Sequence, residues 1–309
     1  MPVNAIAPFE FSENVAGITF YNSNEFSLEK LNLLYDDVKP ELIYCAGWNN
    51  EIYIKFCKSK SRNSKTLLGF DNPWIGTIRQ HIGSFVFSIN TTPYFNYVFI
   101  PGLRQIKFAL KMGFKESQII TGAYSADVDF FKFDGKEEVI SKVFVFAGRY
   151  VKEKGIDLLC ESFIELKSSG LLSDWKLYCI GKGTYQIPKH SDIIDYGFRQ
   201  PNELKEIIKS GGVFVLPSSF EPWGVVVHEF AASGFPLLCS DAVGAADVFL
   251  LNGKNGYIFK HNNKQDLKLK MLMFSKLSLS ELKLMQNESR LKAFQLTPQK
   301  WASKIYSLI

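Results

Sequence analysis

The stretch VFVFAGRYVKEKGIDLLCESFIELKSS, residues 143–169, decides the fold that we expect for this chain. It opens with a continuously apolar run over residues 143–147 and passes through a glycine and a basic loop. The apolar side chains of residues 156–168 then recur at helical spacing. A strand that is apolar on both faces is typical of a parallel sheet covered by helices on both sides. We therefore expect a strand, a loop and a helix here, in that order.

The same alternation continues as far as residue 241. Strand-like and helix-like runs follow one another: WKLYCIG (175–181), PNELKEIIKSG (201–211), GVFVLPS (212–218), VVVHEFAASG (225–234) and PLLCSD (236–241). Repeated strand–helix–strand units specify a parallel sheet with right-handed crossovers, so the fold class is α/β. Such sheets bind ligands outside the carboxyl ends of their strands, and we expect a site in the loops that follow them.

The N-terminal part shows the α/β pattern less clearly. Strands are expected at ELIYCAG (41–47), TLLGF (66–70) and SFVFSIN (84–90), and helices at FSLEKLNLLYDDV (26–38) and LRQIKFALKMG (103–113). The polar, glycine-bearing segment 132–138 is the candidate linker. We predict an N-terminal domain over residues 1–135 and a C-terminal domain over 136–295, with a helix over roughly 296–309 that packs back on the first domain.

Composition excludes several classes of protein. Apolar residues make up 46% of the chain and charged residues 22%, which excludes disorder, collagen and coiled coil. A net charge of +5 is too small to indicate nucleic-acid binding without a concentrated patch. The cysteines form no CxxC pair and lie in apolar runs, as buried thiols do in a reducing compartment. No leader or spanning segment is recognised, so we expect a cytoplasmic protein, with a peripheral position on the inner face of the cytoplasmic membrane left open.

The most informative segment is LPSSFEPWGVVVHEFAASG, residues 216–234, which places Glu221 and Glu229 eight residues apart. A strand ends near Pro217, a loop turns through Gly224, and a helix begins near Val225. The free N–H groups at the start of this helix are suited to a phosphate. Glu221 can accept sugar hydroxyls and Glu229 can hold a ribose diol. The alternative is that both are ordinary solvated glutamates.

Two further loops follow predicted strands. In AGRYVKEKG (147–155), Arg149 and Lys154 can converge on a diphosphate, Arg149 through its planar fork and Lys154 as a point charge. The segments IGKG (180–183) and DYGFRQPNEL (195–204) place glycines at strand ends. Taken alone, a basic loop is most often solvated and such glycines most often serve turns.

Together, in this order and spacing, these segments resemble glycosyltransferase family 4 over roughly residues 140–262. The resemblance implies a GT-B fold, in which two Rossmann-like domains with parallel sheets face a central cleft. It also implies that Arg149 and Lys154 bind the donor diphosphate, that Glu229 binds the ribose and that Glu221 binds the transferred sugar. The backbone from Trp223 to Val226 would contact sugar and phosphate, and residues 197–199 would lie near the base. The implied donor-binding residues are Gly148, Arg149, Lys154, Gly181, Gly183, Gly197, Phe198, Arg199, Glu221, Trp223, Gly224, Val225, Val226 and Glu229.

The N-terminal part departs from the family pattern. The usual early strand with its glycine-rich loop is not recognisable, which predicts a shortened or remodelled N-terminal domain. Where family members often have a His-Asp pair, this chain has Phe70-Asp71. Asp71 is therefore an acceptor-side candidate, grouped with Glu221, Arg149 and Lys154 as the catalytic set. A turn or cap role before Asn72-Pro73 is the equal alternative.

The resemblance implies a retaining glycosyltransferase, of hexosyl or N-acetylhexosaminyl type. It would transfer a sugar from a nucleotide diphosphate sugar, most readily a UDP-sugar, to a carbohydrate or lipid-linked glycan hydroxyl in polysaccharide or glycoconjugate biosynthesis. No cofactor or metal is expected, because two cations and a helix N-terminus stabilise the departing diphosphate. Asp127-Val-Asp129 is a DxD sequence, but it stands where the family has an inter-domain element, and a metal site there is disfavoured. A catalytically inactive nucleotide-sugar-binding subunit and an epimerase on the same fold remain alternatives.

Excess positive charge lies in residues 51–115, which contain ten Lys or Arg residues and two acidic residues. Arg104, Lys107, Lys111 and Lys115 are predicted to share one face of a helix. This face is either simply solvated or it docks on anionic lipid, which would suit a lipid-linked acceptor.

Overall fold

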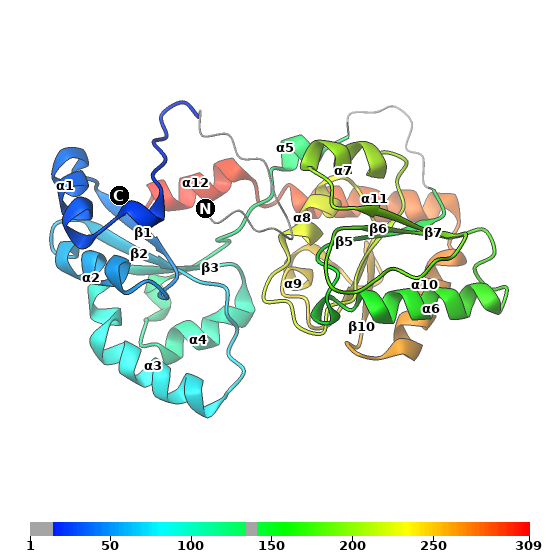
Figure 1. Ribbon diagram of the computed structural model, residues 1–309, viewed down its shortest axis with the longest axis horizontal. Helices are drawn as coiled ribbons and strands as arrows, with labels where there is room; N and C mark the ends of the chain where they lie inside the picture. The colour runs from blue at the N-terminus through cyan, green and yellow to red at the C-terminus, as the bar shows by residue number, and fades with distance from the viewer. Residues whose placement is uncertain (1–14, 134–140) are drawn as a thin grey trace. The chain divides into compact units, whose positions relative to one another are not determined.

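The computed structural model describes residues 15–133 and 141–309, which form two units (Figure 1). The first unit comprises residues 15–124 together with Gln299–Ile309, and the second comprises residues 125–133 and 141–298. The predicted domain boundary between residues 135 and 136, and most of the predicted linker, lie outside the described residues.

The second unit contains a parallel sheet of six strands, as the alternating runs predict. Along the sheet the order is β10-β9-β8-β5-β6-β7. The strands are β5 (Val143–Ala147), β6 (Lys176–Ile180), β7 (Ile193–Gly197), β8 (Val213–Leu216), β9 (Leu237–Ser240) and β10 (Gly256–Phe259). The chain winds from β5 outward to β7, then returns to β8 beside β5 and winds the other way. The sheet therefore has its switch point between β5 and β8, where α/β sheets bind ligands.

Helices cover both faces of this sheet, which explains why β5, β8 and β9 are buried along their whole length. Helices α6 and α10 pack together on one face, and α8 packs against α5, α9 and α11 on the other (Figure 1). The helices are α5 (Val128–Phe131), α6 (Ile156–Ser168), α7 (Pro201–Ile208), α8 (Val225–Ala232), α9 (Ala246–Phe249), α10 (Lys264–Ser275) and α11 (Leu279–Ala293), with a 3-10 turn η5 (Lys152–Lys154).

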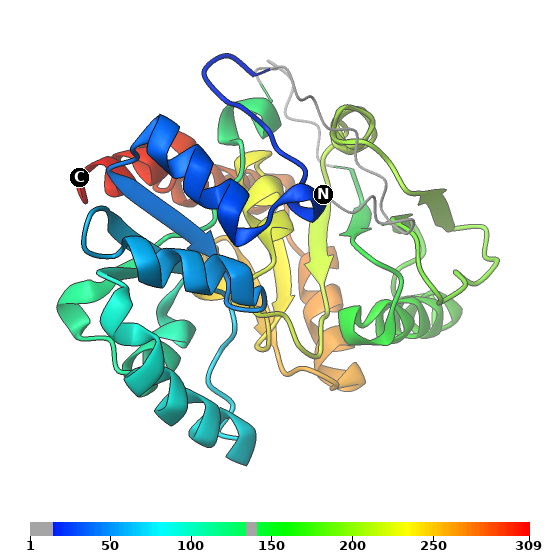
Figure 2. The same ribbon diagram turned by 60° about the vertical axis from the view of Figure 1, so that its left-hand side comes forward.

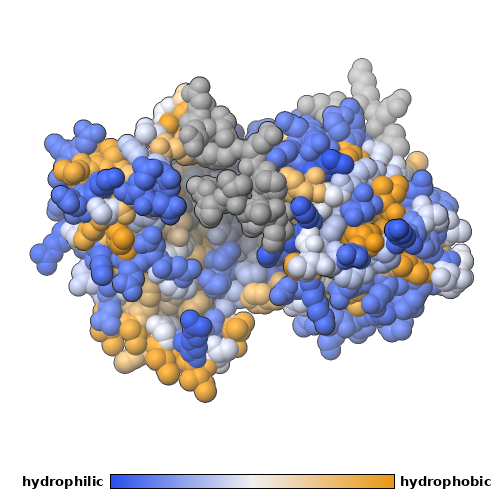
Figure 3. Space-filling view, viewed as in Figure 1, coloured by the Kyte–Doolittle hydropathy of each residue, from blue (hydrophilic) through white to orange (hydrophobic). Residues whose placement is uncertain are grey.

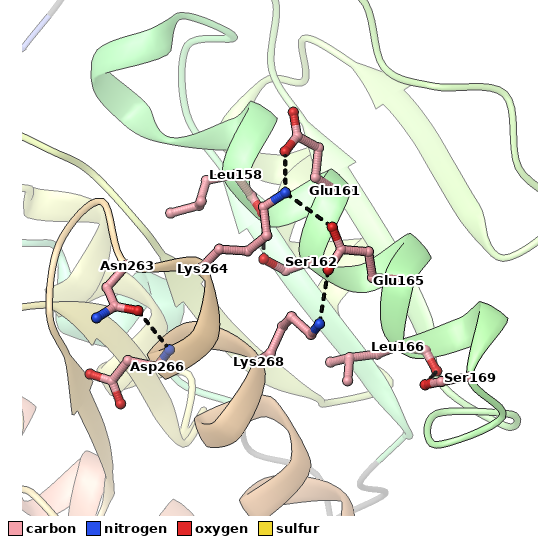
Figure 4. A network of polar contacts seen from close by, with 10 residues as sticks. All are labelled: Leu158, Glu161, Ser162, Glu165, Leu166, Ser169, Asn263, Lys264, Asp266 and Lys268. Carbon is pink, nitrogen blue, oxygen red and sulfur yellow. Dashed lines mark hydrogen bonds and ion pairs between the residues drawn. The ribbon is translucent and has the colours of Figure 1, made fainter.

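An ion-pair network joins α6 to α10 at the surface (Figure 4). Lys264 Nζ lies 2.7 Å from Glu161 Oε2 and 3.0 Å from Glu165 Oε1, and Lys268 Nζ lies 2.8 Å from Glu165 Oε2. Asn263 caps α10 by accepting from the Asp266 N–H. Because these carboxylates are solvent-exposed, water screens the pairs and each adds little to stability. The network links the exposed edges of the two helices.

His228 connects three segments inside the second unit. Its Nδ1 accepts the Ala126 N–H at 3.0 Å, and its Nε2 donates to the Ala293 carbonyl at 2.9 Å. The ring stacks on Phe249 and is fully buried. Burial lowers the pKa of His228 from 6.5 to about 4, so the ring is neutral at pH 7. His228 thus joins α8, the start of α5 and the end of α11, a structural role that agrees with packing rather than catalysis.

The first unit is built on a parallel sheet of four strands in the order β1-β2-β3-β4. The strands are β1 (Leu42–Ala46), β2 (Lys65–Gly69), β3 (Tyr97–Ile100) and β4 (Ile119–Thr121). The helices are α1 (Leu28–Val38), α2 (Glu51–Lys60), α3 (Ile78–Asn90), α4 (Ile106–Lys111) and α12 (Pro298–Tyr306), with 3-10 turns η1 (Ser23–Glu25), η2 (Thr92–Tyr94), η3 (Leu103–Gln105) and η4 (Glu116–Gln118).

Helix α12 closes one face of this sheet. Trp301, Ile305 and Leu308 pack against Leu67 and Phe99. The Trp301 indole N–H donates to the Ala123 carbonyl at 2.7 Å, and Lys304 Nζ donates to the Thr121 carbonyl at 2.8 Å. Helices α2, α3 and α4 lie on the opposite face, as Figures 1 and 2 show. The last segment of the chain is therefore part of the first unit.

Two expectations for the first unit are wrong. SFVFSIN (84–90) is the end of helix α3 and not a strand. Its alternating Phe85, Phe87 and Ile89 imitate a strand, but the apolar residues from Ile78 onward follow helical spacing, and the Thr77 hydroxyl caps the helix by accepting the Gln80 N–H. The strand that follows, β3, lies at 97–100.

The predicted basic helix is also shorter than expected. Helix α4 ends at Lys111, and Gly113 follows with a φ of 89°. That left-handed conformation stops a helix, and Lys115 precedes the separate turn η4. Arg104, Lys107, Lys111 and Lys115 therefore do not share one helical face.

We predict that His228→Ala lowers the free energy of unfolding by about 2–4 kcal/mol, because it leaves a buried N–H and a buried carbonyl without partners. The loss is measured by urea unfolding at pH 7. The control His261→Ala removes an exposed imidazole and costs less than about 1 kcal/mol.

The same variant tests the pKa of His228. Because the folded-state pKa is lowered, the unfolded chain binds the proton more readily, so this group's stabilisation is present above pH 6.5 and is lost as the pH falls toward 4. The wild type should lose more stability than His228→Ala over that range. Equal losses in both proteins would show that His228 is not held neutral.

Candidate active site

The switch point of the second unit brings two predicted loops together. The loop 148–155 follows β5, the loop 217–224 follows β8, and these strands are neighbours in the sheet. The Ser219 N–H donates to the Glu153 carbonyl at 2.8 Å, and the Gly155 backbone lies so close to the Pro217 carbonyl that a Cβ would collide with it. The segments that carry Arg149, Lys154 and Glu221 therefore form one cluster.

Lys154 and Glu221 form an ion pair at the centre of this cluster. The Glu221 side chain is only 10% exposed and that of Lys154 only 18% exposed, so water screens the pair weakly. The family resemblance implies different partners for these residues, the transferred sugar for Glu221 and the diphosphate for Lys154. In this structure each is the partner of the other, which the spacing of the two motifs does not reveal.

The loop after β5 is held from its other side by the loop after β6. The Tyr150 N–H donates to the Lys182 carbonyl at 3.0 Å, and the Tyr150 carbonyl accepts the Tyr185 N–H at 2.9 Å. Gly181 and Gly183 meet this backbone at such short range that a Cβ at either would collide with a carbonyl, of Gly148 and Tyr150 respectively. These glycines are thus required for packing between loops, and the exposed Arg149 stands on a rigid support.

The Tyr150 hydroxyl donates to Asp195 Oδ1 at 2.8 Å, and the same oxygen accepts the Gly197 N–H at 2.9 Å. Burial and this hydrogen bond raise the pKa of Tyr150, so its hydroxyl stays protonated. Sequence reasoning missed Asp195. Its position next to Gly197, in a segment that precedes a glycine-bearing strand-end loop, was the available signal.

Gly197 ends β7, and Phe198 and Arg199 follow it at the same end of the sheet. Phe198 is half-buried, and Arg199 Nη1 lies 3.7 Å from Glu203 Oε1 of α7 on the half-exposed side of that helix. The structure therefore places these residues in the set of strand-end loops, one strand further from the switch point than the Gly181 loop.

Helix α8 begins directly after the Glu221 loop. Gly224 is its N-cap residue and has no side chain that could accept the N–H groups of the first turn. The backbone N–H groups of Val225 and Val226 are at a helix start, where no earlier carbonyl of the helix can accept them. Together with the helix dipole they favour an anion next to Lys154.

Trp223 contributes to this loop through its side chain, which is buried against Phe249. The Trp223 carbonyl accepts the Ala245 N–H at 2.8 Å, and the Glu221 carbonyl accepts the Gly244 N–H at 3.0 Å. These contacts anchor the loop on the segment that follows β9. The indole of Trp223 and its carbonyl are thus structural anchors of the loop.

Glu229 lies one helical turn after Val225 in α8, so the two residues share one face of the helix. Burial raises the pKa of its carboxyl from 4.5 to about 7, with no cation to offset it among the described residues. A desolvated acid beside a loop cluster is typical of a binding site. Glu229 is not the surface glutamate that the alternative interpretation required.

Asp71 lies in the first unit, after the end of β2. It is half-buried, and desolvation raises its pKa. The Gln105 amide donates to the Asp71 carbonyl at 2.8 Å, which fixes the backbone there. Burial, and to a smaller extent the neighbouring Asp71 and Tyr44, raise the pKa of Tyr124 to about 12. The structure thus adds two tyrosines to Asp71 at the carboxyl end of this sheet, and neither was singled out from the sequence.

Asp127 of the DxD sequence is the N-cap of α5, where its carboxylate accepts the Phe130 N–H at 3.0 Å. A cap role accounts for this aspartate without a ligand. Within residues 15–133 and 141–309, no group of three or more acidic, histidine or cysteine side chains is arranged to hold a metal ion.

Comparison with known families identifies residues 127–290, slightly more than half of the chain, with the family described as glycosyl transferases group 1. An uncharacterised glycosyltransferase of Methanocaldococcus jannaschii is 29% identical over 116 residues, covering 35% of this chain and 29% of its own. The capsular polysaccharide biosynthesis glycosyltransferase CapM of Staphylococcus aureus is 32% identical over 123 residues, covering 37% of this chain and 31% of its own. The chain thus spans less than half the length of these relatives.

Solved structures share the fold over a larger part of the chain. A glycosyltransferase from Rickettsia africae has a TM-score of 0.73 at 15% identity, covering 94% of this chain and 83% of its own. HepE of Anabaena, in a complex with UDP, has a TM-score of 0.74 at 13% identity, covering 91% and 81%. At such identities the likeness concerns the fold, and it confirms the GT-B architecture with its two parallel sheets.

We predict that Glu229→Gln stabilises the protein above pH 7. A carboxyl whose folded-state pKa is raised binds its proton more tightly in the folded state, so the wild type loses stability as the pH rises from 4.5 through 7. One pKa unit corresponds to ~1.4 kcal/mol, so the loss is on the order of 2–3 kcal/mol. Glutamine should remove it.

Urea unfolding at pH 5 and pH 8 measures this difference, and Glu206→Gln, an exposed glutamate of α7, is the matched control. If the wild type and Glu229→Gln show the same change between the two pH values, Glu229 is ionised in the folded protein as an exposed glutamate would be.

Proposed function

The chain belongs to the glycosyl transferases group 1 family, and from this premise we propose that it transfers a sugar from a nucleotide diphosphate sugar to a glycan hydroxyl. The donor is a UDP-sugar carrying a hexosyl or N-acetylhexosaminyl group, and the acceptor is a carbohydrate or a lipid-linked glycan in polysaccharide or glycoconjugate biosynthesis. Transfer proceeds with retention, as in glycosyltransferase family 4.

One observation carries this proposal: a shielded Lys–Glu pair lies next to an uncapped helix start at the switch point of a parallel sheet. Before the donor arrives, Glu221 satisfies the charge of Lys154. A diphosphate brings negative charge to the same place and competes with Glu221 for the ammonium group. Lys154 then faces phosphate, and the carboxylate of Glu221 becomes free to accept hydroxyls of the transferred sugar.

Charge stabilisation of the leaving diphosphate is the main catalytic effect in this proposal. Arg149 is exposed on a rigid loop and can reach the outer phosphate with its planar fork. Lys154 and the N–H groups of Val225 and Val226 stabilise the charge that develops as the bond to the sugar breaks. These groups replace a metal ion as the source of positive charge, so no metal is required.

The nucleoside is held by the neighbouring loops. The ionised carboxylate of Glu229 accepts hydrogen bonds from the ribose diol. Burial favours the protonated carboxyl in the free protein, so donor binding releases this proton. The segment 197–199 lies near the base. Support for UDP comes from structural neighbours: HepE of Anabaena binds UDP and UDP-glucose, and TarM of S. aureus was solved with UDP and an α-GlcNAc-glycerol.

The acceptor is proposed to bind the first unit, where Asp71, Tyr44 and Tyr124 gather at the end of the sheet. A carboxylate with a raised pKa can accept a hydrogen bond from the attacking hydroxyl and orient it. The name of CapM, a capsular polysaccharide enzyme, supports a glycan acceptor.

We predict that Arg149→Ala and Lys154→Met each weaken UDP binding by about ten- to a hundredfold and leave uridine binding within about twofold, because a charge-assisted hydrogen bond contributes roughly 1.5–3 kcal/mol. Isothermal titration with both ligands measures the difference. The control is Lys152→Ala, which removes an exposed cation from the same turn. Equal losses for UDP and uridine, or an equal loss in the control, would contradict a phosphate role.

We predict that Glu221→Gln reduces turnover with the UDP-sugar by about ten- to a hundredfold while UDP affinity stays the same or rises, because its loss frees Lys154 for phosphate. Glu229→Gln should instead weaken both UDP and the UDP-sugar, since both carry the ribose. Initial rates and titrations of the two variants separate the roles. A severe loss of UDP affinity in Glu221→Gln would refute the exchange of partners at Lys154.

A further inference from the structure

Helix α3 of the first unit has its apolar side chains on the outside. Ile78, Ile82, Phe85 and Ile89 are between 58% and 80% exposed. Their spacing of four, three and four residues places them in one line along the helix, which we call the α3 stripe. Ile75 and Val86 are also exposed beside this line. Single exposed apolar residues need no explanation, but a continuous row of this kind marks a surface that contacts something.

Apart from Phe87, the inward face of α3 is made of smaller and more polar residues. Ser84 is buried, Phe87 contacts Trp48, and Ser88 lies against the backbone of Gly113. The helix is therefore amphipathic in the reverse sense to an ordinary surface helix, with its strongest apolar side turned away from the core. Packing within the first unit does not account for the α3 stripe. Figure 3 shows the orange surface that results, at the lower end of this unit.

Charge around the stripe is of one sign. Residues 72–115 contain five basic residues and no acidic residue. Arg79 is exposed on α3 itself, and Lys107 and Lys111 are exposed on α4, which packs beside α3. A basic surface next to a row of long apolar side chains is the composition of helices that lie in the interface of an anionic bilayer.

The length of the helix agrees with this partner. The four stripe residues span eleven residue steps, about 16 Å at the helical rise, and a helix lying flat places all of them at one depth. Among the described residues, no helix is long and apolar enough to cross a bilayer. Contact in the plane of the membrane surface needs no such helix.

We propose that the α3 stripe docks on the surface of a bilayer that contains anionic lipid, with Arg79, Lys107 and Lys111 contacting the headgroups. This differs from the sequence-based expectation, which placed the contact on Arg104, Lys107, Lys111 and Lys115 alone. The apolar part of the surface lies on α3, in the segment that the sequence suggested was a strand. Docking does not depend on sugar transfer, and it places the first unit where a lipid-linked glycan would be found.

Flotation with lipid vesicles tests the proposal. The full chain is mixed with vesicles of phosphatidylcholine containing roughly one third phosphatidylglycerol, and with vesicles of phosphatidylcholine alone. We expect the wild type to float with the anionic vesicles. The double variant Ile82→Gln, Phe85→Gln should partition at least about tenfold more weakly, because it loses two large apolar side chains.

The matched control is Leu284→Gln, Leu291→Gln, which removes two similarly exposed leucines from α11 and should leave flotation unchanged. Lys107→Gln, Lys111→Gln should lower binding about tenfold on anionic vesicles only, and added salt should lower wild-type binding. Thermal unfolding and UDP titration confirm that each variant is folded, so loss of docking is distinguished from failure of the transfer site.

Three results would overturn the proposal. The first is a wild type that does not float with anionic vesicles. The second is an α11 control that loses as much binding as the α3 variant. The third is analytical ultracentrifugation in which the wild type is a dimer and the α3 variant a monomer while neither floats, which would assign the stripe to a second copy of the chain.

Discussion

The ion pair between Lys154 and Glu221 is the interaction on which the loops of the second unit depend. It joins the segment after β5 to the segment after β8, and both side chains are largely removed from water. A charge in such a place needs a partner, so neither residue can be replaced without exposing the other to an unfavourable environment. The backbone contact from Ser219 to Glu153 also joins these two loops, and the contact from Gly244 to Glu221 anchors the second of them on the segment after β9. An anion that enters this place meets a lysine and a helix start that are already positioned.

Each unit contains a carboxyl group whose pKa is shifted by its surroundings. Glu229 and Asp71 both have raised pKa values, and in each case desolvation is the main cause. A ligand that supplies hydrogen bonds to such a carboxylate regains part of the free energy that burial costs. His228, next to Glu229 in the chain, is also buried, but both of its ring nitrogens already have backbone hydrogen-bond partners. It therefore has no ring nitrogen left to bind a ligand.

Much of the second unit could be predicted because its strands are continuously apolar and its loops carry glycine and charge at strand ends. The order of the strands in the sheet and the contact between the loops after β5 and β8 could not be predicted from the sequence, because they depend on residues far apart in the chain, such as Glu153 and Ser219. In the first unit, the alternation of Phe85, Phe87 and Ile89 predicts a strand for SFVFSIN, whereas in the structure Phe85 and Ile89 share the outer side of helix α3 and Phe87 lies on its inner side. Exposed apolar residues mislead pattern-based prediction, because the method assumes that the apolar side faces the core.

The central claim is that a nucleotide diphosphate takes Lys154 away from Glu221, and a double-mutant cycle on UDP affinity tests it most directly. UDP is titrated calorimetrically into the wild type, Glu221→Gln, Lys154→Met and the double variant. If the claim holds, Glu221→Gln strengthens UDP binding while Lys154 is present and not in the Lys154→Met background, so the two substitutions are not additive, with a coupling of about 1 kcal/mol or more. Additive effects would contradict it, because Glu221 would then influence UDP without acting through Lys154.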